Sequence, residues 1–231
     1  MKILITGGGT EEPIDSVRSI CNISTGRTAS FLAEYFLGRG YDVSALMARR
    51  AVVPSAPSNS KGAFTLLRYK TFAELSAMLE TECKSGCYDA VVHAAAVSDY
   101  SPATVEIDGK TFAPGEILKL PSDGDLTIHM KRNPKLLGSL RGWMGGAATI
   151  VAFKLTSGAS QQNREEAVGK LFRTSAPDAV VSNDLSEISG DAHPSTLHHA
   201  DGRVIFCATL EELAAALESL LVTMADTRRE R

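Results

Sequence analysis

The chain has 231 residues, and 24 Lys and Arg against 27 Asp and Glu give it a formal net charge of −3. Its apolar fraction of 44% excludes a wholly disordered chain, and its slightly acidic charge argues against a dedicated nucleic-acid-binding protein. No apolar run approaches the roughly 20 residues that span a membrane, and four scattered cysteines are too few for a disulfide framework. We therefore expect a cytoplasmic protein with reduced thiols and with neither membrane nor nucleic-acid partners.

The pattern of apolar and polar residues predicts strands that alternate with amphipathic helices. The expected strands are residues 2–6, 41–48, 64–69, 88–96, 126–130, 149–153, 179–182 and 204–207. The expected helices are residues 25–38, 72–86, 134–143, 162–174 and 210–224. Because the strands are continuously apolar and the helices amphipathic, this order predicts a parallel sheet with helices on both faces. We expect one domain over residues 1–225 and a frayed tail over residues 226–231.

Residues 99–124 do not fit this alternation. They contain Pro102, Pro114 and Pro121, show little periodicity and carry many polar groups. Loops longer than about 12–15 residues are uncommon, and they are usually active-site lids or linkers. Since this segment lies between two core strands, we expect a lid at about residues 100–124. A mobile excursion or hairpin without a catalytic role is the alternative.

A glycine-rich loop, residues 7–9, follows the first strand. Glycine there lets backbone amides approach a phosphate closely. The dinucleotide fingerprint G-x-G-x-x-G is not met, because Glu12 stands at the third glycine position. Arg49 and Arg50 follow the second strand, where an acidic residue would bind an adenine ribose. An NAD(P)-dependent oxidoreductase is therefore disfavoured, although it stays an alternative.

Two further segments are candidates for ligand binding. Residues 24–27, Ser-Thr-Gly-Arg with Asn22 upstream, suit an anion at a helix start, and simple N-capping by Ser24 or Thr25 is the alternative. Residues 94–100 end a buried strand, where small side chains leave room for a ring or a sugar. Asp99 can accept hydrogen bonds from hydroxyls there, and a turn or capping role is the alternative.

The remaining polar candidates are individually weak. A lysine such as Lys119, Lys154 or Lys170 taken alone is usually a surface residue, and an Asn-Asp pair such as 183–184 is usually a turn. Three histidines, His193, His198 and His199, stand in a polar segment without patterned carboxylate or thiol partners, so we expect no metal site.

Taken together, five blocks resemble one family. Residues 5–27, 94–100, 119–137, 152–155 and 182–185 are similar, in order and approximate spacing, to phosphopantothenoylcysteine synthetase, also called phosphopantothenate–cysteine ligase. The resemblance implies a Rossmann-like α/β ligase of coenzyme A biosynthesis that joins 4′-phosphopantothenate to L-cysteine through an acyl-nucleotidyl intermediate. CTP or ATP with Mg²⁺ would be consumed, and a homodimer is implied. Because the chain begins at the synthetase strand, we expect a monofunctional protein without flavin.

The resemblance also assigns roles to residues. Asn22 and Lys119 would be catalytic, with Asn22 on the acyl carbonyl of the intermediate and Lys119 acting from the lid. Phosphopantothenate would be bound by Asn22, Ser24, Thr25, Gly26 and Arg27. The nucleotide would be bound by Gly7, Gly8, Gly9, Ala94, Ala95, Ala96, Asp99, Phe153, Lys154, Lys170 and Asn183.

The lid departs from the family pattern. Bacterial members often carry several lysines there, whereas Lys119 alone precedes residues 120–122, Leu-Pro-Ser. The segment before Lys119 is also longer than the family pattern, which leaves the register of the lid open. A nucleotide-sensing homologue that lost the chemistry is therefore a further alternative. The choice between CTP and ATP depends on backbone contacts that the sequence does not reveal.

Overall fold

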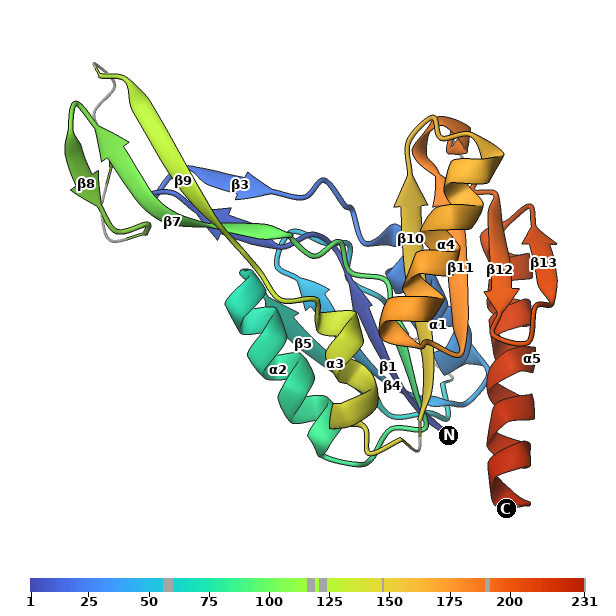
Figure 1. Ribbon diagram of the computed structural model, residues 1–231. Helices are drawn as coiled ribbons and strands as arrows, with labels where there is room; N and C mark the ends of the chain where they lie inside the picture. Colours follow the sequence, from blue (N-terminus) through green and yellow to red (C-terminus); the bar gives the residue numbers. More distant parts are fainter. Residues whose placement is uncertain (56–59, 116–118, 121–123, 147, 190–191, 231) are drawn as a thin grey trace.

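The computed structural model describes residues 1–55, 60–115, 119–120, 124–146, 148–189 and 192–230 (Figure 1). Its centre is an eight-stranded sheet in the order β13-β12-β11-β10-β6-β1-β4-β5. Six strands pair in parallel: β1 (Lys2–Gly7), β4 (Asp42–Ala48), β5 (Phe64–Tyr69), β6 (Ala90–His93), β10 (Thr149–Thr156) and β11 (Ala179–Asp184). The predicted α/β fold with a mostly parallel sheet is confirmed.

One edge of this sheet corrects the expectation of parallel strands throughout. Strand β12 (Ser195–His199), which we did not predict, pairs antiparallel with β11, and β13 (Val204–Cys207) pairs antiparallel with β12. Among the histidines, His198 and His199 therefore lie in a strand and not in a polar loop. The short connection over residues 200–203 explains the pairing, because it closes a hairpin with no room for a crossover helix.

In the part of the chain that the structure describes, five helices cover the sheet: α1 (Arg27–Gly38), α2 (Phe72–Lys84), α3 (Leu136–Trp143), α4 (Gln161–Ser175) and α5 (Leu210–Arg229). Helices α1 and α5 pack together on one face, and α2, α3 and α4 follow one another on the other (Figure 1). A short 3-10 turn, η1 (Leu185–Glu187), follows β11. Among the described residues, none of the helices is long and apolar enough to span a membrane.

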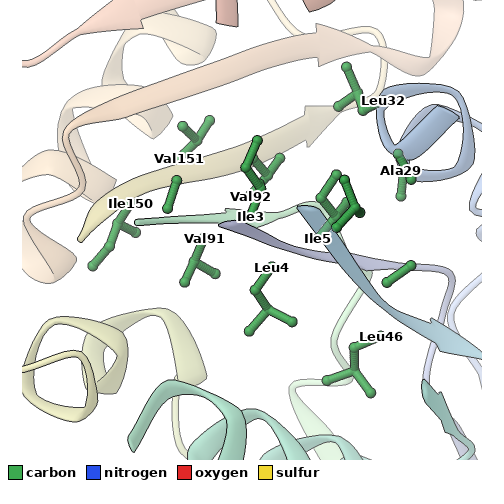
Figure 2. Packing of buried hydrophobic residues seen from close by; sticks show 14 of the residues in the cluster. Ile3, Leu4, Ile5, Ala29, Leu32, Leu46, Val91, Val92, Ile150 and Val151 are labelled. Carbon is green, nitrogen blue, oxygen red and sulfur yellow. The ribbon is translucent and has the colours of Figure 1, made fainter. Parts of the chain in front are cut away.

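Alternate residues of the central strands face opposite layers of helices. Leu4 and Val91 point toward α2 and α3, whereas Ile5 and Val92 point toward α1, where they approach Leu32 (Figure 2). All five side chains are fully buried. Because burial of one such side chain contributes about 1.5–3 kcal/mol, this two-sided core is what holds the carboxyl ends of the strands in register.

The prediction of a loop without regular structure over residues 99–124 is wrong over most of that segment. Strands β7 (Tyr100–Ile107), β8 (Lys110–Phe112) and β9 (Leu126–Arg132) form a three-stranded antiparallel sheet that projects from the main sheet (Figure 1), and we call these strands the arm. Asp108 and Gly109 make the turn between β7 and β8 with φ of 46° and 73°. An Asp-Gly pair between two strands is a strong hairpin signal, which the prolines obscured. Residues 116–118 and 121–123 of the predicted lid lie outside the described residues.

A second ribbon supports the arm. Strands β2 (Glu11–Pro13) and β3 (Ser19–Cys21) pair antiparallel and were not predicted, since each has only three residues. Ile14 of the connecting turn packs in a small cluster with Val105, Ile107 and Leu120 of the arm segment. The arm therefore has its own apolar contacts, separate from the core of the main sheet.

The predicted frayed tail is helical to Arg229. Arg228 explains this continuation, because its guanidinium donates hydrogen bonds to Thr149 Oγ1 at 2.6 Å and to the carbonyl of Asp89 at 3.3 Å. These contacts tie the end of α5 to the start of β10.

Candidate active site at the carboxyl edge of the sheet

The carboxyl ends of the parallel strands meet at one edge of the sheet. Thr6 is in register with His93 of β6, Gly7 with Met47 of β4, and Thr156 of β10 with Asp184 of β11. The chain leaves β1 toward β4 and β5 on one side, and it continues from β6 to β10 on the other. The boundary between β1 and β6 is thus a topological switch point, the place where open α/β sheets bind ligands.

The glycine loop and the small residues after β6 lie side by side at this switch point. The Ala96 N–H donates to the carbonyl of Gly8 at 2.9 Å, and the Thr10 N–H donates to the carbonyl of Ala96 at 3.1 Å. Ala94, Ala95 and Ala96 are partly exposed. The structure thus brings together two of the segments that the sequence predicted to bind nucleotide.

Gly9 is needed for a close chain crossing. A Cβ atom at Gly9 would lie 2.0 Å from the backbone oxygen of Asn22, so only glycine allows Asn22 to cross the loop. The Asn22 N–H also donates to the carbonyl of Thr10 at 3.2 Å. The half-buried Asn22 is therefore held by its backbone directly against the glycine loop.

The start of α1 is not capped by a hydroxyl. Gly26 is the N-cap residue, with φ of 72° and no side-chain cap. The alternative of N-capping by Ser24 or Thr25 is therefore wrong, although Thr25 Oγ1 lies 3.4 Å from the N–H of Arg27. Thr25 Oγ1 thus accepts a hydrogen bond from the first residue of α1, and both Ser24 and Thr25 line the neighbouring pocket.

A pocket of about 240 Å³ adjoins the loop. Three of the predicted phosphopantothenate residues, Asn22, Ser24 and Thr25, line it, whereas Gly26 forms the cap and Arg27 is exposed on α1. The other lining residues are Gly9, Glu11, Cys21, Ile23, Ala48, Arg49, Arg50, Ala51 and Lys70. Sequence reasoning did not place Arg49, Arg50 or Lys70 in a pocket with Asn22. Their positions directly after β4 and β5 were the available signal.

Glu11 is a buried carboxylate beneath these cations. Arg50 Nε lies 3.0 Å and Lys70 Nζ lies 3.4 Å from its oxygens, and Ser19 Oγ donates to it at 2.8 Å. Burial acts to raise the pKa of Glu11, but the hydrogen bond from Ser19 and the charges of Lys70 and Arg50 outweigh it, and the pKa is lowered. Glu11 is therefore ionised and holds two of the pocket's cations in place.

The other predicted nucleotide residues are more dispersed. Asp99 is exposed and forms an ion pair with Lys135, and its carbonyl accepts from the Asn133 N–H at 2.8 Å. Phe153 and Lys154 are half-buried near the end of β10, and Lys170 is exposed on α4. Asn183 lines a different cavity of about 250 Å³, together with residues of α4, β12 and β13.

Asp184 is a fully buried anchor that sequence reasoning treated as part of a turn. It accepts hydrogen bonds from the N–H groups of Gly158 at 2.7 Å and Ala159 at 3.1 Å, and from Thr156 Oγ1 at 2.7 Å. Hydrogen bonds from Ser186 and Thr156 hold the pKa of Asp184 far below its usual range. The ionised carboxylate thus fixes the loop between β10 and α4.

Two buried residues that the sequence reasoning missed support the switch point. Tyr69 donates from its hydroxyl to the carbonyls of Gly7 at 3.0 Å and Gly8 at 3.1 Å. Burial lowers the pKa of His93 to about 4, and its Nδ1 lies 2.9 Å from Thr6 Oγ1. Their common signal was a polar group at the end of an apolar strand.

Lys119 lies beside the arm. Its side chain is exposed, and among the residues that the structure describes it forms no ion pair. The next residue, Leu120, is buried, and its N–H donates to Asp15 Oδ2 at 3.0 Å. Within the described ranges, no group of three His, Cys, Asp or Glu side chains has an arrangement that holds a metal ion.

Comparisons with known proteins agree with this architecture. Residues 1–223 match the family described as the DNA/pantothenate metabolism flavoprotein C-terminal domain. The coenzyme A biosynthesis bifunctional protein CoaBC of Thermococcus kodakarensis is 29% identical over 196 residues, which cover 85% of this chain and 44% of that protein. The chain spans about half the length of the curated relatives that it matches.

Solved structures share the fold. A DNA/pantothenate metabolism flavoprotein of Streptococcus pneumoniae has a TM-score of 0.83 at 26% identity, covering 96% of this chain and 99% of that one. A Cab2 mutant in complex with phosphopantothenate-cysteine has a TM-score of 0.72 at 21% identity, covering 97% and 88%. From the match over nearly the whole chain, we conclude that this chain belongs to the family of the DNA/pantothenate metabolism flavoprotein C-terminal domain.

Proposed function

We propose that the chain joins 4′-phosphopantothenate to L-cysteine, with CTP or ATP converted to the nucleoside monophosphate and pyrophosphate. Family membership supports this reaction, as does the naming of the curated relatives for coenzyme A biosynthesis. A protein of similar fold has been solved with phosphopantothenate-cysteine. The observation that carries the proposal is the position of Asn22, between the glycine loop and a cation-lined pocket.

The chemistry requires two anionic substrates to meet. A carboxylate is a poor acyl donor, so an oxygen of the phosphopantothenate carboxylate attacks the nucleotide α-phosphorus and pyrophosphate leaves. The amine of cysteine then attacks the acyl carbonyl of the mixed anhydride, loses a proton, and the nucleoside monophosphate leaves. No electrons change hands, so this reaction needs no flavin.

Asn22 serves the second step in this proposal. Its side-chain amide donates a hydrogen bond to the acyl oxygen, where negative charge develops as the amine attacks. The close backbone crossing over Gly9 supports this role, because it fixes the backbone of Asn22 beside the glycine loop.

The nucleotide occupies the β6 side of the switch point in this proposal. Phosphate and sugar lie against the loop of Gly7, Gly8 and Gly9 and against Ala94–Ala96. The carboxylate of Asp99 binds the ribose hydroxyls, and its ion pair with Lys135 is then broken. Phe153, Lys154 and Asn183 surround the base, and Lys170 reaches the triphosphate. Mg²⁺ would accompany the nucleotide and offset the charge of its phosphates, and we assign it no protein ligand.

Lys119, which lies beside the arm, acts on the nucleotide in this proposal, and the arm shields the intermediate. An acyl phosphate anhydride must be kept from water, so a segment that closes over the nucleotide is needed. The contacts of Leu120 with the arm and with Asp15 support this role, because they hold the residue next to Lys119. We also propose a cytoplasmic homodimer, for which light scattering should give a mass near twice the 24.6 kDa of one chain.

Pyrophosphate release tests the proposal. The protein is incubated with phosphopantothenate and either CTP or ATP, first without and then with cysteine, and products are identified by mass spectrometry. We expect acyl-nucleotide without cysteine and phosphopantothenoylcysteine with it, and the two nucleotides reveal the preference. Nucleotide binding without either product would contradict the proposal and favour a nucleotide-sensing homologue.

A further inference from the structure

The pocket beside Asn22 carries a concentration of positive charge that the proposed roles leave unused. Its lining includes Ser24, Thr25 and three cations, Arg49, Arg50 and Lys70, which we call the basic rim. The basic rim follows β4 and β5, whereas Ala94–Ala96 follow β6 on the other side of β1. The pocket and the proposed nucleotide site therefore lie on opposite sides of the glycine loop.

The charges of the basic rim are only partly neutralised. Among the described residues that line the pocket, Glu11 is the single carboxylate, and it is shared by Arg50 and Lys70. Arg49 lies 4.0 Å from Glu74, and both side chains are largely exposed, so this pair is weak. Glu11 neutralises one of the three positive charges of the basic rim. The lining of the pocket therefore keeps a net charge of two positive charges, which suits a ligand that is a dianion.

The turn that carries Arg49 and Arg50 is held by hydrogen bonds from Arg68 and from its own backbone. Arg68 donates from Nη2 to the carbonyls of Ala48, at 2.8 Å, and Arg49. The Arg49 N–H donates to the carbonyl of Tyr69 at 2.8 Å, and the Ala51 N–H closes the turn onto Ala48 at 2.9 Å. The exposed guanidinium groups of Arg49 and Arg50 therefore start from an ordered backbone, so that less backbone freedom is lost when an anion binds.

We propose that the basic rim binds the phosphate monoester of 4′-phosphopantothenate, so that this substrate lies across Gly9 with its carboxylate at Asn22. The assignment rests on the proposed function and extends it. The carboxylate has to reach the nucleotide on the β6 side, so the far end of the substrate lies on the β4 side, where the basic rim stands. Guanidinium groups bind phosphate oxygens in a bidentate manner, and Arg49 and Arg50 together suit a dianion.

Substrates with and without the phosphate provide the test. The value of kcat/KM is measured for 4′-phosphopantothenate and for pantothenate in the unmodified protein, in Arg50→Ala and in Arg49→Ala/Arg50→Ala. Arg173→Ala, which removes an exposed arginine of α4, is the matched control. Because a hydrogen bond to a charged group contributes about 1.5–3 kcal/mol, we expect the preference for the phosphorylated substrate to fall roughly 10–100-fold in the rim variants alone.

The outcomes separate this assignment from other anions. KM for nucleotide and KM for cysteine should change less than about twofold, since neither is placed at the basic rim. A preference that is unchanged overturns the assignment, as does a defect confined to the nucleotide or to cysteine. Arg50→Gln, which keeps a hydrogen-bond donor near Glu11, decides the question if thermal unfolding shows that the alanine variants misfold.

Failure of the proposed function is recognised separately. If the unmodified protein makes no phosphopantothenoylcysteine, the ligase proposal is wrong and the rim assignment falls with it. If the unmodified protein makes product and the rim variants retain its preference, only the rim assignment is wrong.

Discussion

The carboxylate of Asp15 accepts a hydrogen bond from the backbone N–H of Leu120 at 3.0 Å and thereby joins the β2–β3 ribbon to the residue that follows Lys119. The same carboxylate accepts from the N–H groups of Val17 and Arg18 at 2.9 and 2.6 Å. The hydrogen bond from Leu120 is the main cause that lowers the pKa of Asp15, so the carboxylate stays ionised at neutral pH. Asp15, which lies far from Lys119 in the sequence, thus fixes the position of the backbone next to the proposed lid lysine.

Asp15→Ala should weaken the placement of Lys119. Loss of the acceptor leaves the Leu120 N–H without its partner, and we expect the first half-reaction to slow several-fold and proteolysis of residues 113–124 to accelerate. Asp201→Ala is the matched control, because Asp201 also accepts backbone and arginine hydrogen bonds but lies between β12 and β13. Equal proteolysis of both variants would contradict this role of Asp15.

Lys119→Ala should lower the first half-reaction by roughly 10²–10³-fold, an effect comparable to loss of one oxyanion donor. Stability should change by less than about 0.5 kcal/mol, because the side chain is exposed. Lys110→Ala, on β8 of the same arm, is the control and should retain activity. If Lys110→Ala abolishes turnover and Lys119→Ala does not, the register of the lid is shifted.

Asn22→Ala and Asn22→Asp should spare the first half-reaction and slow the second. The amide donor to the acyl oxygen is lost in both variants, whereas nucleotide and carboxylate still meet. Acyl-nucleotide should therefore accumulate and be detected by mass spectrometry after brief incubation with cysteine. Loss of turnover without any intermediate would show that Asn22 does not act on the acyl carbonyl.

Gly9→Ala should destabilise the protein by about 1–3 kcal/mol, as overpacking usually does. The added Cβ would lie 2.0 Å from the Asn22 carbonyl oxygen, so the crossing has to shift and both half-reactions should weaken. Gly142→Ala in α3 is the control, because nothing lies within 4 Å of its Cβ position. Denaturant unfolding should show this second variant unchanged or slightly more stable.

Stability should fall in mildly acidic solution because of His93. Its pKa is lowered by burial to about 4, so the unfolded state binds the proton first as pH falls below the ordinary histidine value. The contribution of neutral His93 to the free energy of unfolding is fully present above about pH 6.5 and is lost progressively toward pH 4. The total loss is about 3 kcal/mol. Unfolding in urea at pH 7, 5.5 and 4.5 should show a smaller loss in His93→Gln, and parallel curves would exclude His93 as the cause.

The main sheet was predictable because its signals are local. The apolar runs of β1, β4 and β6 and the helical spacing of α1 and α2 lie within single segments, and burial on both faces leaves little choice of structure. In the arm, β9 was predicted as a strand, whereas β7 and β8 were missed for a different reason. The Asp108-Gly109 turn was present in the sequence, but three prolines and polar strands that face solvent hid the alternation around it.

Composition and order along the chain determined the α/β class, the glycine loop and the segment that carries Asn22. Only the tertiary structure decided which of these residues share a pocket. Asn22 lines the same pocket as Arg50 and Lys70 because β4 and β5 lie on one side of β1. Glu11 pairs with these two cations because the β2–β3 ribbon folds back over the sheet edge. Such groupings depend on strand order and on buried charges compensating one another across long sequence separations, which no local pattern of residues specifies.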